Sequence, residues 1–135
     1  MKVKLNGGII PTRAHSSDAG YDLYAIESVT IAPGKSHTFD TGVCLEIPWG
    51  FVGFVKSKSG LNVRHGLTSE GVIDSGYIGS IKVKLYNHGT DPYHVNYGDK
   101  ISQIVILPIY TPELELVETL EPTERGDKGF GSTGR

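Results

Sequence analysis

The sequence has 135 residues, of which 13 are basic and 15 acidic, and its net charge at pH 7 is −2. This length suffices for one domain with its own core, and the near-neutral charge argues against a nucleic-acid partner bound through bulk charge. No stretch approaches the roughly 18 apolar residues of a membrane span, and the first residues, MKVKLNGG, lack the apolar core of a signal peptide. The single cysteine, Cys44, cannot form an intramolecular disulfide, which fits a reducing compartment. We expect a soluble, cytoplasmic protein without a membrane or nucleic-acid partner.

Short β-rich runs follow one another along the whole chain. In chain order they are 3–5, 21–26, 28–31, 37–47, 51–57, 79–87, 101–110 and 114–120. The chain contains 18 glycines and 7 prolines, and this glycine share is nearly twice the usual value of about 7%. Only LNVRHG, after Gly60, could form as much as one helical turn. Short strands with turn signals about every 8–12 residues predict an all-β sandwich or barrel.

Three of these runs carry further information. Residues 81–86 alternate between apolar and polar side chains, which predicts a half-buried strand. Residues 104–109, IVILPI, are apolar at nearly every position, which is typical of a strand buried on both faces. Prolines flank the alternating run 114–120, which predicts a strand on a separate arm. We therefore expect a β body over 1–108, an arm over 109–124 and a glycine-rich mobile tail over 125–135.

The segment DAGYDLYA places Asp18 and Asp22 around a glycine turn. Two carboxylates four residues apart on a loop can hold the hydration shell of a magnesium ion. They can equally well cap the turn. The residues alone leave both interpretations open.

The segments SKSGL and GDKISQ each contain groups that suit a phosphate ligand. Lys58, Ser59 and Gly60 follow a predicted strand on a tight turn, where a cation, a hydroxyl and an open backbone N–H can bind phosphate oxygens. A solvated turn is the alternative. Gln103 lies between apolar residues of a predicted strand, so its amide needs either a backbone partner or a ligand.

The segment EGVIDSGYIG places Asp74 directly after the apolar pair Val72 and Ile73 and before a turn. An aspartate in this place usually caps its own turn, and a catalytic carboxylate is the less common case. Tyr77 alone would be an aromatic residue at the edge of a sheet. The segment gains a functional meaning only together with the other motifs.

The C-terminal letters GFGSTG match the dinucleotide-binding pattern G-x-G-x-x-G. That pattern requires a strand before it and a helix after it, and only Arg135 follows here. The phosphate-binding P-loop pattern fails as well, because Ser132 occupies the place of its lysine. A frayed tail is one interpretation. The other is a flexible arm whose Arg125, Lys128 and hydroxyl groups close over a phosphate ligand bound elsewhere.

Five segments, in this order, resemble the motifs of the trimeric deoxyuridine triphosphatase (dUTPase) family: AGYDL, SKSGL, GVIDSGYIG, GDKISQ and RGDKGFGSTG. The resemblance covers residues 1 to 135. It implies a jelly-roll body, a homotrimer with shared active sites, and Mg²⁺-assisted hydrolysis of dUTP to dUMP and pyrophosphate. The dCTP deaminases resemble this family in fold, but the catalytic glutamate motif that they carry is missing here.

The resemblance also implies a role for individual residues. Asp74 would be the catalytic base, Asp22 would contact Mg²⁺ through water, and Tyr77 would pack against the deoxyribose. Backbone groups of a hairpin around residues 67–72 would bind the uracil edge, and Phe130 would stack over the base. The full set of implied substrate-binding residues is Lys58, Ser59, Gly60, Gly71, Val72, Ile73, Tyr77, Gln103, Arg125, Phe130, Gly131, Ser132 and Thr133.

Two features depart from the family pattern. Lys58 stands where arginine is usual, which keeps the charge but loses the bidentate fork. The segment between Gly66 and Gly71 is short, so its base-contacting residues are not carried over. Some members of this fold act as binding or signalling proteins, so a regulatory protein partner stays open, as does a cellular, viral or phage source. Intact Asp74, Tyr77 and Phe130 favour catalysis.

Overall fold

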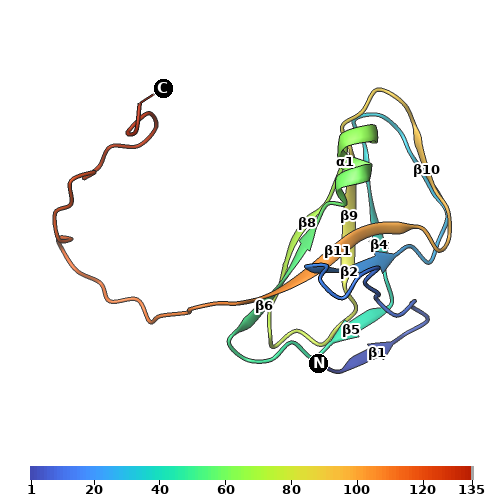
Figure 1. Ribbon diagram of the computed structural model, residues 1–135, viewed down its shortest axis with the longest axis horizontal. Helices are drawn as coiled ribbons and strands as arrows, with labels where there is room; N and C mark the ends of the chain where they lie inside the picture. Colours follow the sequence, from blue (N-terminus) through green and yellow to red (C-terminus); the bar gives the residue numbers. More distant parts are fainter. Residues whose placement is uncertain (135) are drawn as a thin grey trace.

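The computed structural model describes residues 1–134, which form eleven strands and one helix (Figure 1). The helix, α1, spans Ser59–His65. The strands are β1 (Val3–Leu5), β2 (Gly20–Tyr24), β3 (Val29–Ile31), β4 (Ser36–Asp40), β5 (Val43–Leu45), β6 (Phe51–Lys56), β7 (Leu67–Thr68), β8 (Glu70–Ile73), β9 (Lys82–Asn87), β10 (Tyr93–Val95) and β11 (Lys100–Pro108). The prediction of an all-β protein is confirmed.

Two antiparallel sheets enclose the core. The first has the strand order β2-β11-β6-β8 and the second the order β4-β9-β7, while β1 pairs with β5 and β10 with β3. Leu23, Val55 and Ile104 of the first sheet are fully buried with Phe39 and Leu85 of the second, in one hydrophobic cluster. The chain is therefore a β-sandwich, because side chains from the inner faces of both sheets form one core.

The alternation predicted for residues 81–86 is present in β9 and just before it. Ile81, Val83 and Leu85 are buried, whereas Lys82 and Lys84 are exposed. Period-two burial of this kind places one face of the strand against the core and the other toward solvent. Cys44, on β5, is also buried, with a relative exposure of 6%.

Strand β11 is not buried on both faces along its whole length, so that prediction is wrong for its C-terminal half. Ile104 is fully buried, but Leu107 is 39% exposed and Ile109, just beyond the strand, is 41% exposed. Within the described residues no second layer of this chain covers that end of the sheet. Val72 of β8, at the edge of the same sheet, is 61% exposed as well. An uninterrupted apolar run predicts that both faces of a strand are shielded from water. It does not show whether the same chain provides that shielding.

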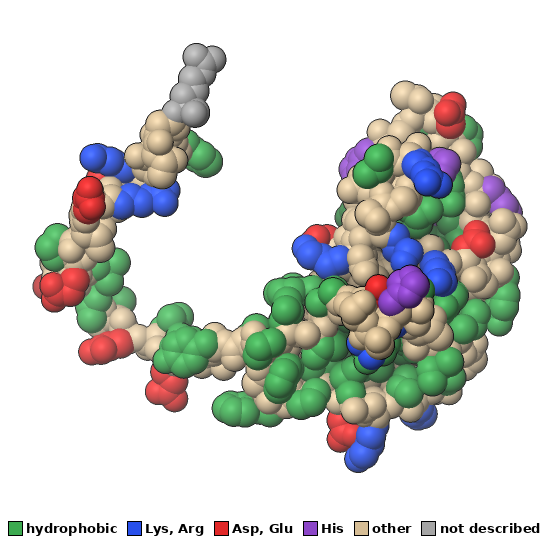
Figure 2. All heavy atoms as spheres, in the orientation of Figure 1, with side chains coloured by type: hydrophobic (Ala, Val, Ile, Leu, Met, Phe, Trp, Pro, Cys, Tyr) green, Lys and Arg blue, Asp and Glu red, His purple; other side chains and the backbone are tan. Residues whose placement is uncertain are grey.

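Residues 109–124 leave the body and extend away from it (Figure 1). The predicted strand over 114–120 is absent from the described chain, and Leu114 and Leu116 are 98% and 99% exposed. A strand forms only where another strand pairs with its backbone, and the arm lies beside no strand of its own chain. Figure 2 shows hydrophobic side chains along this arm and on the body near its base. In the part of the chain that the structure describes, no helix has the length and apolar character needed to cross a membrane.

Candidate active site

Three of the five motif segments meet where β2, α1 and β11 adjoin. Asp22 on β2 lies opposite Gln103 on β11 in the strand register. The Gln103 amide Nε2 donates a hydrogen bond to the backbone oxygen of Ser57, at 3.1 Å. The predicted need of this amide for a partner is thus met by the backbone. This bond ties β11 to the segment that leads into α1.

The segment SKSGL forms the start of a helix and not the tight turn that was expected. Lys58 is the N-cap residue, with an extended backbone, and its carbonyl accepts a hydrogen bond from Asn62 N at 2.9 Å. The helix ends at Gly66, whose φ of 69° is the left-handed conformation that favours glycine. The prediction of a single turn was too short, because α1 has seven residues. Ser59 and Gly60 remain exposed in its first turn.

Asp22 is buried between two lysines. Its side chain is 9% exposed; Lys58 Nζ contacts one carboxylate oxygen and Lys100 Nζ lies 2.9 Å from the other. Burial raises the pKa of Asp22, but the hydrogen bonds and charges of Lys58 and Lys100 outweigh it, so the net pKa lies below the ordinary value of 3.8. Lys58, at the position of the usual arginine, therefore forms an ion pair with Asp22 while its side chain stays 28% exposed.

The two carboxylates of the segment DAGYDLYA do not form a pair. Asp18 accepts a hydrogen bond from the backbone N of His15, at 2.9 Å, and so caps a turn. Asp22 lies in β2 with both oxygens engaged by lysines. Within residues 1–134 there is no group of three or more His, Cys, Asp or Glu residues that could hold a metal ion.

We expect Asp22→Asn to lower the free energy of unfolding at pH 7 by about 1–3 kcal/mol, because the buried carboxylate is lost and the partly buried ammonium group of Lys58 is left without its partner. A carboxyl whose pKa is lowered on folding stabilises the protein above its unfolded pKa, and this contribution is lost as the pH falls through the folded pKa. The difference between wild type and variant should therefore shrink below about pH 4. Urea unfolding of both proteins at a series of pH values and one protein concentration measures this difference in the free energy of unfolding.

Glu46→Gln is the matched control, since Glu46 pairs with Lys2 at 3.3 Å in an exposed position. That change should cost less than about 1 kcal/mol. Equal losses in the two variants would contradict a structural role for the buried pair.

The third motif forms a separate pocket of about 280 Å³. Asp74 follows β8 and is exposed, and its carbonyl accepts a hydrogen bond from Tyr77 N at 3.0 Å. Val72, Ile73 and Lys82 complete the lining of this pocket. A carboxylate, an aromatic ring and a cation thus face one open space.

The segment before Asp74 is not the hairpin that was expected for binding the uracil edge. β7 (67–68) pairs with β9 of the second sheet, whereas β8 pairs with β6 of the first. The chain crosses from the second sheet to the first at buried Ser69. The backbone N of Ser69 donates a hydrogen bond to Ser57 Oγ at 2.9 Å, and the hydroxyls of Ser69 and Ser102 share a hydrogen bond at 2.7 Å. In the described chain β8 is an edge strand, so half of its backbone polar groups point away from β6.

The tail carries the residues of the fifth motif away from the body (Figures 1 and 2). Arg125 and Lys128 line a hollow of about 420 Å³ within the tail itself, together with Ser132 and Thr133. Phe130 is fully exposed. The predicted site residues of one chain therefore fall into three groups: the first at β2, α1 and β11, the second at Asp74, and the third in the tail.

Residues 6–134 match the family model of the dUTPases. The chain belongs to the dUTPase family. A deoxyuridine 5'-triphosphate nucleotidohydrolase of Clostridioides difficile is 45% identical over 135 residues, covering 97% of this chain and 94% of the relative. One from monkeypox virus is 44% identical and covers 92% of this chain and 82% of the relative.

Solved dUTPase structures share the fold of this chain. A mutant of the Staphylococcus bacteriophage 80alpha dUTPase with dUpNHpp superposes with a TM-score of 0.92 at 33% identity, covering 99% of this chain and 98% of the other. A mutant dUTPase from phage phi11 of S. aureus, described for the coordination of a structural Mg(II) ion, has a TM-score of 0.81 at 32% identity, over 87% and 96% of the two chains. The β-sandwich described above is the jelly roll of the dUTPases.

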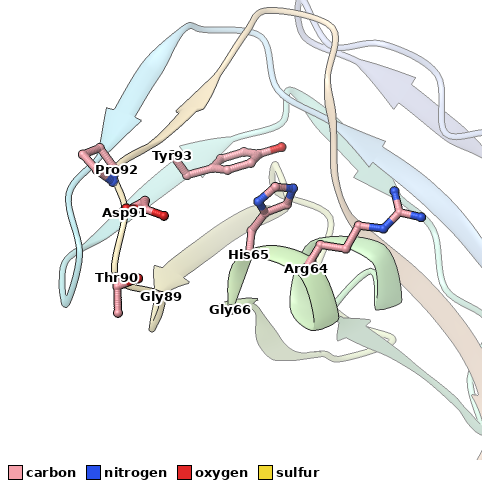
Figure 3. A pocket seen from close by; sticks show the side chains of 8 residues that line it. All are labelled: Arg64, His65, Gly66, Gly89, Thr90, Asp91, Pro92 and Tyr93. Atoms are coloured by element: carbon pink, nitrogen blue, oxygen red, sulfur yellow. The ribbon is translucent and has the colours of Figure 1, made fainter.

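A further pocket, of about 250 Å³, lies at the C-terminal end of α1 and contains none of the predicted site residues (Figure 3). His65 and Tyr93 lie in it with ring centroids 5.0 Å apart. Burial, followed by the charge of Asp99, raises the pKa of Tyr93. This pocket is distinct from the three groups of dUTPase motif residues.

Sequence reasoning missed two cations beside these groups. Lys100 lies inside GDKISQ and binds Asp22, although only Gln103 was singled out there. Lys82 lines the Asp74 pocket from the outer face of β9. The alternation of residues 81–86 did place Lys82 on the solvent side, but only the packing of β9 beside the Asp74 turn brings it to this pocket.

Proposed function

We propose that the protein is a dUTP nucleotidohydrolase, which hydrolyses dUTP to dUMP and pyrophosphate, lowers the dUTP level and supplies dUMP for dTMP synthesis. The observation that carries the proposal is the Asp74 pocket, in which a carboxylate and Tyr77 line one open space within a chain that belongs to the dUTPase family. The cytoplasmic location stays a prediction from the sequence.

Phosphoryl transfer depends on positioning, charge neutralisation and an oriented nucleophile more than on covalent help from the protein. Asp74 accepts a proton from the water that attacks the α-phosphorus. The bond from the water oxygen to this phosphorus forms as the α–β bridging P–O bond breaks, and pyrophosphate leaves. Ser59 and Gln103 bind the phosphates from the body, and Arg125, Ser132 and Thr133 bind them from the tail.

Mg²⁺ is the proposed cofactor, and the residues present fit an ion that is held through its own waters and the substrate phosphates. Mg²⁺ usually keeps several waters and binds through substrate phosphates instead of a cage of protein ligands. The described residues contain no such cage, and the lowered pKa of Asp22 keeps its carboxylate ionised. Asp22 would accept hydrogen bonds from water on the ion. When bound, the ion neutralises charge on the phosphates.

The base and the sugar are selected by different physical means. Backbone groups on the free edge of β8, at Gly71 to Ile73, bind the hydrogen-bonding edge of uracil. Cytosine leaves these polar groups unpaired, and the methyl group of thymine is excluded by volume. The ring of Tyr77 packs against the deoxyribose where a ribose would carry its 2′-hydroxyl. Phe130, together with Gly131, closes over the base.

The proposed active unit is a homotrimer with shared sites. Ser59 and Gln103 come from one chain, Asp74 and Tyr77 from a second, and the tail from a third. Two observations support this arrangement. The three groups of site residues lie apart in one chain, and the arm projects away from its own body (Figure 1). The exposed apolar side chains at the end of β11 would be covered by the other chains.

A pyrophosphate-release assay with Mg²⁺ tests the function. We expect turnover of dUTP, with turnover of dCTP, dTTP and UTP slower by more than about tenfold, because each fails one of the filters above. The Asp74→Asn protein, prepared in the same way, controls for contaminating phosphatases. Absence of dUTP turnover would refute the enzyme, and a dTTP rate within about tenfold of the dUTP rate would contradict the pocket.

A further inference from the structure

Tyr77 is held by a chain of hydrogen bonds that ends on a different strand. The Tyr77 hydroxyl donates to the backbone oxygen of Ser80, at 2.8 Å. The hydroxyl of Ser80 in turn donates to a carboxylate oxygen of Asp40. Asp40 is the last residue of β4 and lies opposite Lys82, the first residue of β9. The ring that faces the Asp74 pocket is thus connected, through Ser80, to the body of the sandwich.

Asp40 is the centre of this network. Besides Ser80, its carboxylate accepts hydrogen bonds from the backbone N of Gly42 at 3.0 Å and from Lys82 Nζ at 3.1 Å. The hydrogen bonds from Ser80 and Gly42, with a smaller contribution from Lys82, hold the pKa of Asp40 below its ordinary value. Asp40 is therefore ionised at neutral pH and presents a strong, fixed acceptor to the Ser80 hydroxyl.

The segment that carries Tyr77 is irregular and largely exposed up to buried Ile81. Residues 74–80 contain no strand or helix, and Ile78 is 73% exposed. Inside the segment, the backbone hydrogen bond is the one from Tyr77 N to Asp74 O. A Cβ atom on Gly79 would lie only 2.7 Å from the Tyr77 hydroxyl oxygen, so the ring lies directly against this backbone. The position of the ring depends on the Ser80 carbonyl. This carbonyl is held by the hydrogen bond from the Ser80 hydroxyl to Asp40 and, through the same peptide unit, by the hydrogen bond from Ile81 N to Val43 O at 2.8 Å.

We propose that Asp40 is a positioning residue that sets the selectivity of the site for deoxyribose over ribose, acting through Ser80 on Tyr77. This inference rests on the proposed function, in which the Tyr77 ring fills the space that a 2′-hydroxyl would need. A side chain excludes a slightly larger substrate only if the side chain itself is held in place. Without the hydrogen bond from Ser80 to Asp40, the Tyr77 ring can move aside, and UTP can then enter the site.

The expected effect differs from that of a purely structural role. If Asp40 only caps the turn at Gly42, its loss lowers kcat/KM for dUTP and UTP by the same factor. If it anchors Tyr77, UTP gains relative to dUTP, because only the ribose depends on displacing the ring. The measured quantity is therefore the ratio of kcat/KM for dUTP to kcat/KM for UTP, and not the activity itself.

The experiment compares Asp40→Ala and Ser80→Ala with the wild type. Ser80→Ala removes the link but leaves both the Gly42 cap and the Ser80 carbonyl, so it keeps the test valid if Asp40→Ala fails to fold. We expect both changes to lower the dUTP-to-UTP ratio by about tenfold. Asp40→Asn keeps an acceptor oxygen for Ser80 and should stay within about threefold of wild type.

Glu27→Ala is the matched control, because Glu27 binds His37 of the same strand β4 at 2.8 Å without any link to Tyr77. Its ratio should equal that of the wild type. A ratio that is unchanged in both Asp40→Ala and Ser80→Ala, in a protein whose wild type hydrolyses dUTP, overturns the anchor and leaves the proposed function intact. A wild type that does not hydrolyse dUTP overturns both.

Discussion

Asp74→Asn is expected to lower kcat for dUTP by about 10²- to 10⁴-fold, the usual contribution of a general base. The substituted amide keeps the shape of the side chain but cannot accept a proton from the attacking water. Since Asp74 acts on the water and not on the nucleotide, binding should change little. Asp74 is exposed in an open pocket and not buried in the core, so the change should leave the fold intact.

Two measurements separate catalysis from binding. Single-turnover rates of dUTP hydrolysis give the loss in the chemical step, and calorimetry with dUpNHpp gives the affinity. Asp91→Asn is a suitable control, because Asp91 lies in the separate pocket at the end of α1. It should behave as the wild type does. Near-normal turnover by Asp74→Asn would remove Asp74 from the role of catalytic base.

Two inactive variants are expected to restore activity when they are refolded together. The first carries Asp74→Asn with an intact tail, and the second ends at Glu124 with Asp74 intact. The tail lies apart from the body that carries β8 in one chain (Figure 1), and in the proposed trimer the tail and Asp74 meet only between chains. With equal amounts and random assembly, about a quarter of the sites receive both an intact Asp74 and a tail, so we expect about a quarter of wild-type activity.

The outcome distinguishes shared sites from sites within one chain. If tail and Asp74 came from the same chain, every site in the mixture would lack one of them, and the mixture would be as inactive as its components. Native mass spectrometry must first demonstrate mixed trimers. Each variant refolded alone, at the same total concentration, is the control. Inactive mixed trimers would refute the shared site and with it the proposed role of the arm.

The alternation over residues 81–86 was sufficient to predict the inner and outer faces of β9. Such local patterns are readable because successive side chains of a strand point to opposite faces, whatever the strand pairs with. The absence of helical periodicity likewise predicted an all-β fold. The motif segments could be found because their chemistry depends on short runs of neighbouring residues, such as the carboxylate and the aromatic ring of IDSGY.

Which distant residues meet depends on how the strands pair and how the two sheets pack. Whether Asp22 caps a turn, holds a metal-bound water or forms an ion pair depends on Lys58, the N-cap residue of α1, and on Lys100 of β11. The link from Tyr77 to Asp40 joins the loop before β9 to the end of β4.

The run 114–120 has the pattern of a strand but extends alone, because pairing needs a partner that its own chain does not place beside it. Period and propensity are properties of neighbouring residues along the chain. Ion pairs, hydrogen-bond networks and strand partners are properties of residues brought together by folding or by assembly. Local patterns were therefore enough to predict the all-β class, the two faces of β9 and the location of the motifs, whereas the packing decided which strands pair and what each motif residue contacts.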